Sequence, residues 1–241
     1  MKKHVFQFKE FEVSHSRSAM KIGTDSVLLG AWTFVDMNVN SILDVGAGTG
    51  ILALQLAQRS YAETIDAVEI DPDAYEECVH NFENSPWADR LFCYHASFAE
   101  FYSEMDSTYD LIISNPPFFP EQSDRLIKDH ARAQARFQVH LHFDDLLYGV
   151  SQLISTYGSF SVVLPYSEQE TFISKAYAYH LYPSSCLHVK GQPTSPIKRT
   201  LLKFKRIKPD AIETKELTIE RARHDYTQEY KDLVKDFYLK M

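Results

Sequence analysis

Long apolar runs and a secretory leader are both missing from this sequence of 241 residues. No stretch reaches 18 uninterrupted apolar residues, so we expect no membrane-spanning helix. The first 15 residues include Lys2, Lys3 and Lys9 and lack the apolar core of a signal peptide. We therefore expect a cytoplasmic protein.

Cysteine is also scarce. The chain has Cys78, Cys93 and Cys186 without a C-x-x-C pair, and its ten histidines show no ligand spacing. Isolated cysteines of this kind are usually buried free thiols. His140 and His142 lie two residues apart in a segment predicted to be non-helical. We therefore assign no metal site.

The net charge of −8 argues against nonspecific binding of nucleic acid by the whole surface. A compact basic face is still compatible with this charge, and two segments have the composition for one. The first contains Arg125, Lys128, His130, Arg132 and Arg136. The second, residues 187–209, has no Asp or Glu and contains Lys190, Lys198, Arg199, Lys203, Lys205, Arg206 and Lys208. The alternative for each is an ordinary solvated surface.

Apolar strand patterns alternate with helical patterns along most of the chain. Strands are predicted at 41–46, 64–70, 91–96, 109–114 and 159–165, and helices at 51–59, 71–81, 143–155 and 168–179. This alternation predicts an α/β fold with a doubly wound, mostly parallel sheet. Two last strands, 186–191 and 200–207, have no helix between them and predict an antiparallel edge. Residues 226–241 have the apolar spacing of an amphipathic helix.

The segment "DVGAGTG", Asp44 to Gly50, lies between a predicted strand and a predicted helix, as a nucleotide-binding loop does. Gly46 and Gly48 allow the backbone to turn sharply and to approach a ligand closely. The spacing differs from the G-x-G-x-x-G of dinucleotide sites, and the Asp44 carboxylate would repel a pyrophosphate. It would instead suit a cationic amine or its ordered waters.

Glu69 ends the next strand, about 20 residues past the loop, where a carboxylate can accept hydrogen bonds from ribose hydroxyls. The expected ligand has a ribose and a positive group and needs no phosphate, which describes S-adenosylmethionine. With these residues the sequence resembles the Rossmann-like class I methyltransferases, whose first motif looks like "LDVGAGTG". A chance glycine turn and an NAD site are the alternatives. The acidic residue that usually follows the third strand of the family is replaced by Ala96 and Ser97, and Ser97 could hydrogen-bond the adenine amine.

The segment "SNPPFF" ends the strand predicted at 109–114, at the carboxyl edge of the sheet, where methyl donor and acceptor must meet. The Asn115 side-chain oxygen and the Pro116 carbonyl can accept hydrogen bonds from an exocyclic amine and so favour rehybridisation of its nitrogen. Pro116 and Pro117 have a fixed φ, which holds that carbonyl in place. Phe118 can stack on a flipped base. A purely structural turn is the alternative.

The tetrapeptide "NPPF" matches the (Asp/Asn/Ser)-Pro-Pro-(Tyr/Phe/Trp) motif of methyltransferases that modify planar amine or amide nitrogens. Three nitrogens compete: adenine N6, guanine N2 and a glutamine amide. Release-factor glutamine methyltransferases usually carry a helical domain before the catalytic one, and the 43 residues before Asp44 are too few for it. That enzyme and an rRNA guanine-N2 methyltransferase remain alternatives, as does a noncatalytic RNA-binding adaptor on a methyltransferase fold.

The flanks resemble a narrower family. The segments "KIGTDSVLLGAW", "SNPPFF", "RAQAR", "TLLKF" and "YTQEYKDLVKDFYLK" together look like the valine-tRNA adenosine-37 N6-methyltransferases. The resemblance covers nearly the whole chain. It implies S-adenosylmethionine-dependent N6-methylation of the adenine beside the anticodon, with a monomer bound to the anticodon stem-loop of tRNA.

The resemblance also assigns residues. In relatives the "K-x-G-T-D" segment lies over the cofactor, so Lys21 and Thr24 are expected to close that pocket, although Thr24 alone predicts only the N-cap of a helix that begins at Asp25. The predicted cofactor-binding residues are Lys21, Thr24, Asp44, Gly46, Gly48, Gly50, Glu69, Ser97 and Asn115. The predicted RNA-binding residues are Arg132, Arg136, Lys198, Arg199 and Lys203. We expect one domain, 1–241, in which residues 1–40 extend over the cofactor pocket and 41–241 form the core.

Overall fold

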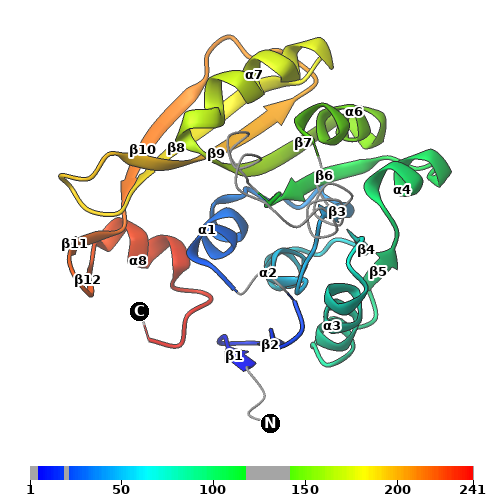
Figure 1. Ribbon diagram of the computed structural model, residues 1–241, viewed down its shortest axis with the longest axis horizontal. Coiled ribbons are helices and arrows are strands. Elements are labelled where there is room, and N and C mark those ends of the chain that lie inside the picture. Colours follow the sequence, from blue (N-terminus) through cyan, green and yellow to red (C-terminus); the bar gives the residue numbers. More distant parts are fainter. Residues whose placement is uncertain (1–4, 19–21, 118–141, 241) are drawn as a thin grey trace, which may run out of the picture.

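A central sheet of eight strands organises the computed structural model, which describes residues 5–18, 22–117 and 142–240 (Figure 1). The strands are β3 (Ser41–Val45), β4 (Thr64–Glu69), β5 (Leu91–His95), β6 (Tyr109–Ser114), β7 (Ile154–Pro165), β8 (Tyr182–Lys190), β9 (Ile197–Lys205) and β10 (Glu213–Thr218). Their order across the sheet is β10-β8-β9-β7-β6-β3-β4-β5. Four short strands of the described residues form two pairs outside this sheet: β1 (Val5–Gln7) with β2 (Glu12–Ser14), and β11 (Glu220–Ala222) with β12 (Asp225–Tyr226).

The sheet is mostly parallel. β5, β4, β3, β6 and β7 run in one direction, and β9 is antiparallel to both β7 and β8. The predicted fold class is therefore confirmed. The structure adds β10, which pairs in parallel with β8 and forms the edge of the sheet. The sequence does not predict this strand because half of its residues are charged and only Leu217 is buried, as suits an edge that must not recruit another strand.

Helices cover both faces of the sheet (Figure 1). They are α1 (Thr24–Trp32), α2 (Ile51–Arg59), α3 (Pro72–Glu83), α4 (Phe98–Glu104), α6 (Phe143–Leu153), α7 (Gln169–Ala178) and α8 (Gln228–Val234), with a 3-10 turn, η2 (Tyr166–Glu168), after β7. The core of one face includes α1, α2, α3 and α8, and the core of the other includes α4, α6 and α7. This three-layer arrangement is the one that the alternating pattern predicts.

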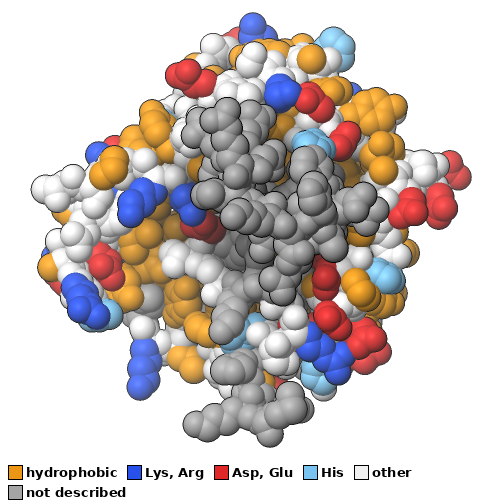
Figure 2. Space-filling view, viewed as in Figure 1, with side chains coloured by type: hydrophobic (Ala, Val, Ile, Leu, Met, Phe, Trp, Pro, Cys, Tyr) orange, Lys and Arg blue, Asp and Glu red, His pale blue; other side chains and the backbone are white. Residues whose placement is uncertain are grey.

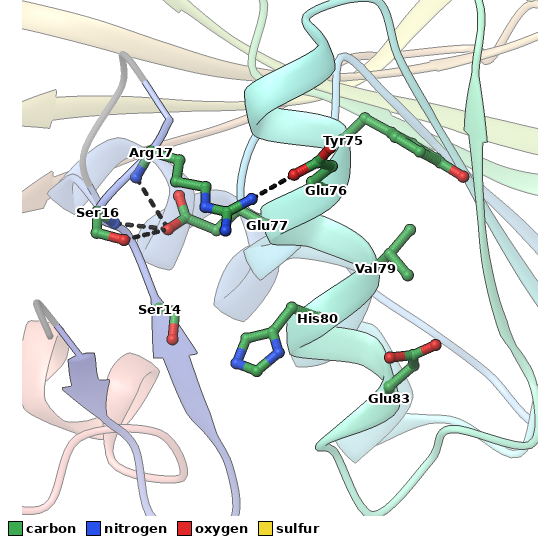
Figure 3. Close-up of a pocket in the computed structure, with 9 residues that line it drawn as sticks. All are labelled: Ser14, Ser16, Arg17, Tyr75, Glu76, Glu77, Val79, His80 and Glu83. Atoms are coloured by element: carbon green, nitrogen blue, oxygen red, sulfur yellow. Dashed lines mark hydrogen bonds and ion pairs between the residues drawn. The ribbon is translucent and has the colours of Figure 1, made fainter.

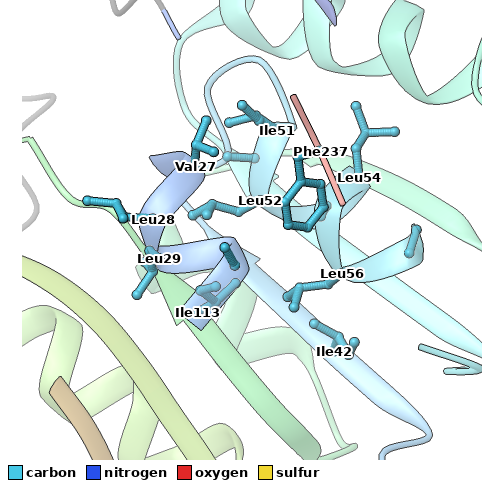
Figure 4. Packing of buried hydrophobic residues seen from close by; sticks show 14 of the residues in the cluster. Val27, Leu28, Leu29, Ile42, Ile51, Leu52, Leu54, Leu56, Ile113 and Phe237 are labelled. Carbon is cyan, nitrogen blue, oxygen red and sulfur yellow. The ribbon is translucent and has the colours of Figure 1, made fainter. Parts of the chain in front are cut away.

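Successive residues of β3 point to the two different cores. Ile42 packs with Leu29 of α1 and Leu56 of α2 in one cluster, and Leu43 belongs to the cluster on the opposite face (Figure 4). All four side chains are fully buried. A strand buried on both faces therefore reads as a continuous apolar run, and the polar Asp44 that follows needs another explanation.

The structure differs from the sequence prediction at two helices. Residues 98–104 form α4, which was not predicted, although Ser97 and Glu100 have the spacing of a capping box and form one. The helix predicted for 226–241 ends at Val234. It ends there because the chain turns, and the Phe237 carbonyl accepts a hydrogen bond of 2.9 Å from the Lys9 backbone N–H. The C-terminal segment is thus tied to the N-terminal hairpin.

Among the described residues, none of the helices combines the length and the apolar character that crossing a bilayer needs. The division of the chain into residues 1–40 and 41–241 stays a prediction.

Candidate active site

The candidate site lies at the carboxyl edge of the parallel strands. The glycine loop follows β3, Glu69 ends β4, and Asn115 follows β6. Since β3 pairs in parallel with both β4 and β6, these three segments emerge side by side. In an open α/β sheet this edge is where ligands bind.

Three glycines of the loop have positive φ angles: 72° at Gly46, 57° at Gly48 and 77° at Gly50. Any other residue would be strained there. A Cβ on Gly50 would also lie 2.5 Å from the Phe82 ring and 2.8 Å from the Cys78 sulfur, whereas a Cβ on Gly46 would meet no atom of the described residues within 4 Å. Gly50 is therefore required for packing as well, and at Gly46 the described residues leave room for a ligand.

Glu69 fixes the loop from the end of β4. Its two carboxylate oxygens accept backbone hydrogen bonds, one of 2.7 Å from Gly48 and one of 2.9 Å from Asp71. The residue is only 8% exposed. A carboxylate oxygen can accept more than one hydrogen bond, so Glu69 can hold the loop and still receive ribose hydroxyls.

Asp44 is fully buried on the face that α2 covers. Its Oδ2 accepts a hydrogen bond of 3.2 Å from the Ala53 backbone N–H, and its Oδ1 has no hydrogen-bond partner among the described residues. Burial raises the pKa of Asp44 to about 7, the negative charge of Glu69 adds to the rise, and the Ala53 bond opposes it. A bound positive group would supply the missing partner and favour the ionised form.

Asn115 is held by α1. Its Nδ2 donates a hydrogen bond of 2.8 Å to the Ser26 Oγ, in the first turn of that helix. The preceding residue, Ser114, donates from its hydroxyl to the Val45 carbonyl at 2.8 Å and ties β6 to β3. With Nδ2 bound to Ser26, the Asn115 Oδ1 is the end of the amide that remains to accept a hydrogen bond, as the sequence analysis requires.

The rest of the proline motif is only partly described. Pro116 is buried and Pro117 is half-buried, so the stiff segment is packed against the protein. Phe118 lies outside the described residues, and its stacking role stays a prediction.

Glu77 of α3 holds residues 14–18 beside the glycine loop (Figure 3). It accepts hydrogen bonds from the backbone N–H groups of Ser16 (2.6 Å), Arg17 (3.0 Å) and Ser18 (2.8 Å). Burial alone would raise the pKa of Glu77, but these bonds and one from the Ser16 hydroxyl hold it below its usual value. Glu77 therefore anchors this segment as a carboxylate at neutral pH.

Asn81 adds a second anchor one turn further along α3. Its Oδ1 accepts from the Ser14 N–H at 2.8 Å, and its Nδ2 donates to the carbonyls of Ser14 (3.0 Å) and Thr49 (2.8 Å). Thr49 belongs to the glycine loop, so Asn81 joins the loop to the N-terminal segment. A cavity of about 440 Å³ lies between this segment and α3, and its described lining residues include none of the predicted site residues (Figure 3).

The structure gives Ser97 and Thr24 specific places. The Ser97 hydroxyl donates to the Glu100 carboxylate at 2.7 Å and accepts from the Glu100 N–H at 3.2 Å, which caps α4. Its contact with adenine stays a prediction. The predicted N-cap at Thr24 is wrong: the helix begins at Thr24 itself, and its N-cap is Gly23, which has no side chain to cap it. Lys21 lies outside the described residues.

The predicted RNA-binding residues of β9 have different surroundings. Lys198 is exposed, and Arg199 donates from Nε to Asp25 Oδ2 at 2.7 Å. The Lys203 ammonium lies 5.3 Å from the centre of the Phe34 ring, beside a cavity of about 300 Å³. Burial lowers the pKa of Lys203, and the charge of Lys205 adds to the shift.

Only one end of β9 lies near the candidate site. Arg199 pairs with Pro165 at the carboxyl end of β7, and Lys203 pairs with Ser161 four residues back along it. At about 3.3 Å per residue, Lys203 is therefore roughly 13 Å further from that edge. In the face shown in Figure 2, the Lys and Arg side chains of the described residues are scattered among Asp and Glu. Arg132 and Arg136 lie outside the described residues.

Sequence reasoning missed the residues that position the site. Ser26, Glu77 and Asn81 each contact a segment that is distant in the sequence, and no short motif connects them to it. The available sign was a polar residue on the apolar face of a helix: Glu77 and Asn81 lie on the same buried face of α3 as Cys78. No group of three or more His, Cys, Asp or Glu residues in the described ranges could hold a metal ion.

Comparisons with known proteins show the family to which the chain belongs. Residues 12–138, more than half of the chain, match the family described as "Methyltransferase small domain". A tRNA1(Val) (adenine(37)-N6)-methyltransferase of Flavobacterium johnsoniae is 53% identical over 98% of this chain and 100% of its own length. One of the same name from Christiangramia forsetii is 50% identical, and the match covers 100% of both chains.

Among solved structures, a predicted O-methyltransferase from Agrobacterium tumefaciens superposes with a TM-score of 0.69. The match covers 88% of this chain and 96% of that one, at 19% identity, and it supports the fold alone. The two Flavobacterium and Christiangramia relatives support more, because they are at least 50% identical and their matches cover 98% or more of this chain. The chain belongs to the tRNA1(Val) (adenine(37)-N6)-methyltransferase family.

Proposed function

We propose that this protein transfers a methyl group from S-adenosylmethionine to N6 of adenine 37 in tRNA1(Val). The observation that carries the proposal is the Asn115 amide, which is bound to Ser26 through its nitrogen and so keeps its oxygen for the amine of the base. Family membership supplies the substrate. The proposal includes a single domain that works as a monomer on the anticodon stem-loop in the cytoplasm.

The described residues fit the methyl donor. Asp44 has a buried oxygen without a described partner, which suits an ammonium group, and at Gly46 the described residues leave room for a ligand. Glu69 lies at the same edge and can receive ribose hydroxyls. When bound, S-adenosylmethionine supplies a methyl group on a sulfonium, so that a bond from carbon to N6 forms as the carbon–sulfur bond breaks and its electron pair stays on sulfur.

The protein's own contribution is positioning and hydrogen bonding. The exocyclic amine of adenine is a weak nucleophile because its lone pair is delocalised into the ring. Hydrogen bonds from its two N–H groups to Asn115 Oδ1 and the Pro116 carbonyl favour the geometry in which that lone pair is directed at the methyl carbon. The methylated amine then loses one proton to water, so no general base is required.

Asn115→Ala tests this function. We expect the variant to keep binding S-adenosylmethionine, apart from any contact that Asn115 itself makes with it, and to lose methyl transfer by a factor of about 10² to 10³, the usual cost of removing a preorganised hydrogen-bonding group. The assay uses labelled donor and total tRNA from a strain that lacks the protein, followed by nucleoside analysis. Undiminished turnover by Asn115→Ala would refute the mechanism.

The same assay separates the alternatives. Label found in N2-methylguanosine would show that the target is guanine and not adenine. Label found in a release factor, when that protein is offered in place of tRNA, would show that the target is a glutamine amide. Calorimetry with S-adenosylmethionine tests the adaptor alternative, because a noncatalytic RNA-binding protein has no need to bind the methyl donor.

A further inference from the structure

We propose that Ser26 is a positioning residue for methyl transfer, because it supplies the acceptor that the Asn115 amide nitrogen needs in the productive orientation. This role rests on the proposed function and concerns a residue that contacts Asn115 and not the substrate itself. Ser26 lies in α1, and the hydrogen bond from Asn115 Nδ2 to its Oγ is 2.8 Å long.

The chemistry of the amide gives this contact its importance. A carboxamide has a donor end and an acceptor end, and the two can exchange by a half-turn about one bond. The target amine is itself a donor, so only the orientation with Oδ1 towards the base is useful. In that orientation the half-buried Asn115 NH₂ needs a partner on the protein side. Ser26 provides it.

The neighbouring backbone has fewer donors to offer than usual. Residues 116 and 117 are prolines and have no N–H group. The Asn115 side chain therefore cannot be fixed by the local turn that commonly binds an Asn oxygen to an N–H two residues further on. Its orientation depends instead on α1, which is 89 residues away in the sequence.

Helix α1 is well placed to serve as a fixed support. Its next residues, Val27, Leu28 and Leu29, are at most 1% exposed and pack in the core with α2. The Val27 carbonyl accepts a hydrogen bond of 3.2 Å from the Gln55 side chain. Asp25, beside Ser26, pairs with Arg199 of β9 at 2.7 Å. The first turn of α1 is thus anchored to both α2 and β9, and Ser26 can act on Asn115 without moving.

Ser26→Thr and Ser26→Val form the matched pair for the test, because they have nearly the same shape and differ in the hydroxyl. We expect the Thr variant to keep the wild-type kcat within about threefold and the Val variant to lose about tenfold, which corresponds to one hydrogen bond. Binding of S-adenosylhomocysteine should stay the same in both, and the Val variant should lose only the small stability that one half-buried hydrogen bond supplies. Ser151→Ala is the control, since its hydroxyl bonds the Tyr148 carbonyl in α6, whose end leads into the opposite edge of the sheet.

A second set of variants, in which residue 115 is Asp, distinguishes a positioning role of Ser26 from a purely structural one. In Asn115→Asp both ends of the side chain are acceptors, so no orientation has to be chosen. We expect Ser26→Ala to reduce kcat about tenfold with Asn115 and less than about threefold with Asp at that position. An equal loss in the two backgrounds would mean that Ser26 only supports α1 and would overturn the inference. So would a wild-type kcat for Ser26→Val.

Wild-type protein in the same assay distinguishes the two proposals. If it does not methylate tRNA, the proposed function fails and the inference fails with it. If it methylates adenine 37 and all Ser26 variants match it, the proposed function stands and only the role of Ser26 is refuted.

Discussion

The glycine-loop half of the site and the Asn115 half are held in different ways. In the first, the anchoring contacts are close in sequence: Asp44 and Ala53 are 9 residues apart, and Gly48 and Glu69 are 21 apart. In the second, the pairs Asn115–Ser26 and Arg199–Asp25 are 89 and 174 residues apart. The first half is therefore built mainly by one continuous part of the chain, from β3 through β4 to α3, whose Asn81 also binds the loop. The second half exists only when distant parts of the fold meet.

This comparison predicts two kinds of failure. Substitutions in the glycine-loop half should reduce stability or ligand binding directly, because the same residues hold the loop in place and contact the ligand. Changes in the Asn115 half should reduce methyl transfer and leave binding of the methyl donor intact. The predictions below test these statements in order of expected size.

Gly50→Ala should have the largest effect. The left-handed backbone costs a non-glycine residue about 1–2 kcal/mol, and the close approach of Phe82 and Cys78 adds overpacking of about 1–3 kcal/mol. We expect a loss of about 3 kcal/mol in the free energy of unfolding, measured by urea denaturation.

Gly46→Ala is the matched control for that measurement. Its φ of 72° is similar, but within 4 Å the added Cβ would meet no atom of the residues that the structure describes. We expect a loss of only about 1–2 kcal/mol in stability, together with weaker binding of S-adenosylmethionine. If the two variants lost the same stability, packing against Phe82 would not be what requires Gly50.

Asp44→Asn should make the ligand-free protein more stable at neutral pH. The folded pKa of Asp44, about 7, lies above its ordinary value of 3.8, so the folded state binds a proton more tightly than the unfolded one. The favourable contribution is complete below about pH 4 and disappears as the pH rises to about 7. We expect the melting temperature of the variant to exceed that of wild type by an amount that grows from pH 4 to pH 7 and is constant above.

The same residue should have the opposite effect on the ligand. A positive group beside Asp44 favours its ionised form, so the affinity of wild type for S-adenosylhomocysteine should gain a component that rises with pH through about 7. Asp44→Asn should lack that component in calorimetry. Identical pH profiles for the two proteins would show that Asp44 does not contact the charged end of the ligand.

Much of the glycine-loop half could be predicted from sequence because its determinants are local. The segment "DVGAGTG" lies between a strand and a helix, and Glu69 ends the next strand. Together they predicted that the ligand binds at the carboxyl edge of the sheet and that it carries a ribose and a positive group. Ser97 and Glu100 carried a capping-box spacing that would have located α4. The strand β10 could not be found by periodicity because it is an exposed, charged edge.

The Asn115 half was predictable only in its motif. The motif "NPPF" predicted that the Asn115 side-chain oxygen is a hydrogen-bond acceptor. Nothing near it in the sequence indicates that Ser26 binds the amide nitrogen or that Arg199 has Asp25 as a partner. Those pairs follow from how α1 lies on the sheet between α2 and β9, which is a tertiary result. A prediction from composition also assigns the same role to every basic residue of a segment. In the structure Lys198 is exposed, whereas Lys203 is partly desolvated over Phe34.

Lys198→Ala is the smallest of the expected effects and tests that last difference. The Lys198 ammonium has no ion-pair partner in the described part of the chain, whereas Arg199 is already paired with Asp25. If Lys198 binds a phosphate of the stem-loop, its removal should weaken tRNA binding and reduce the slope of log affinity against log salt by about 0.7–0.9. Adding Arg199→Ala should flatten the slope by less than a second full unit, because Arg199 is already partly neutralised by Asp25 and so contributes less than a free cation. A slope unchanged by both substitutions would place the RNA-binding surface away from β9.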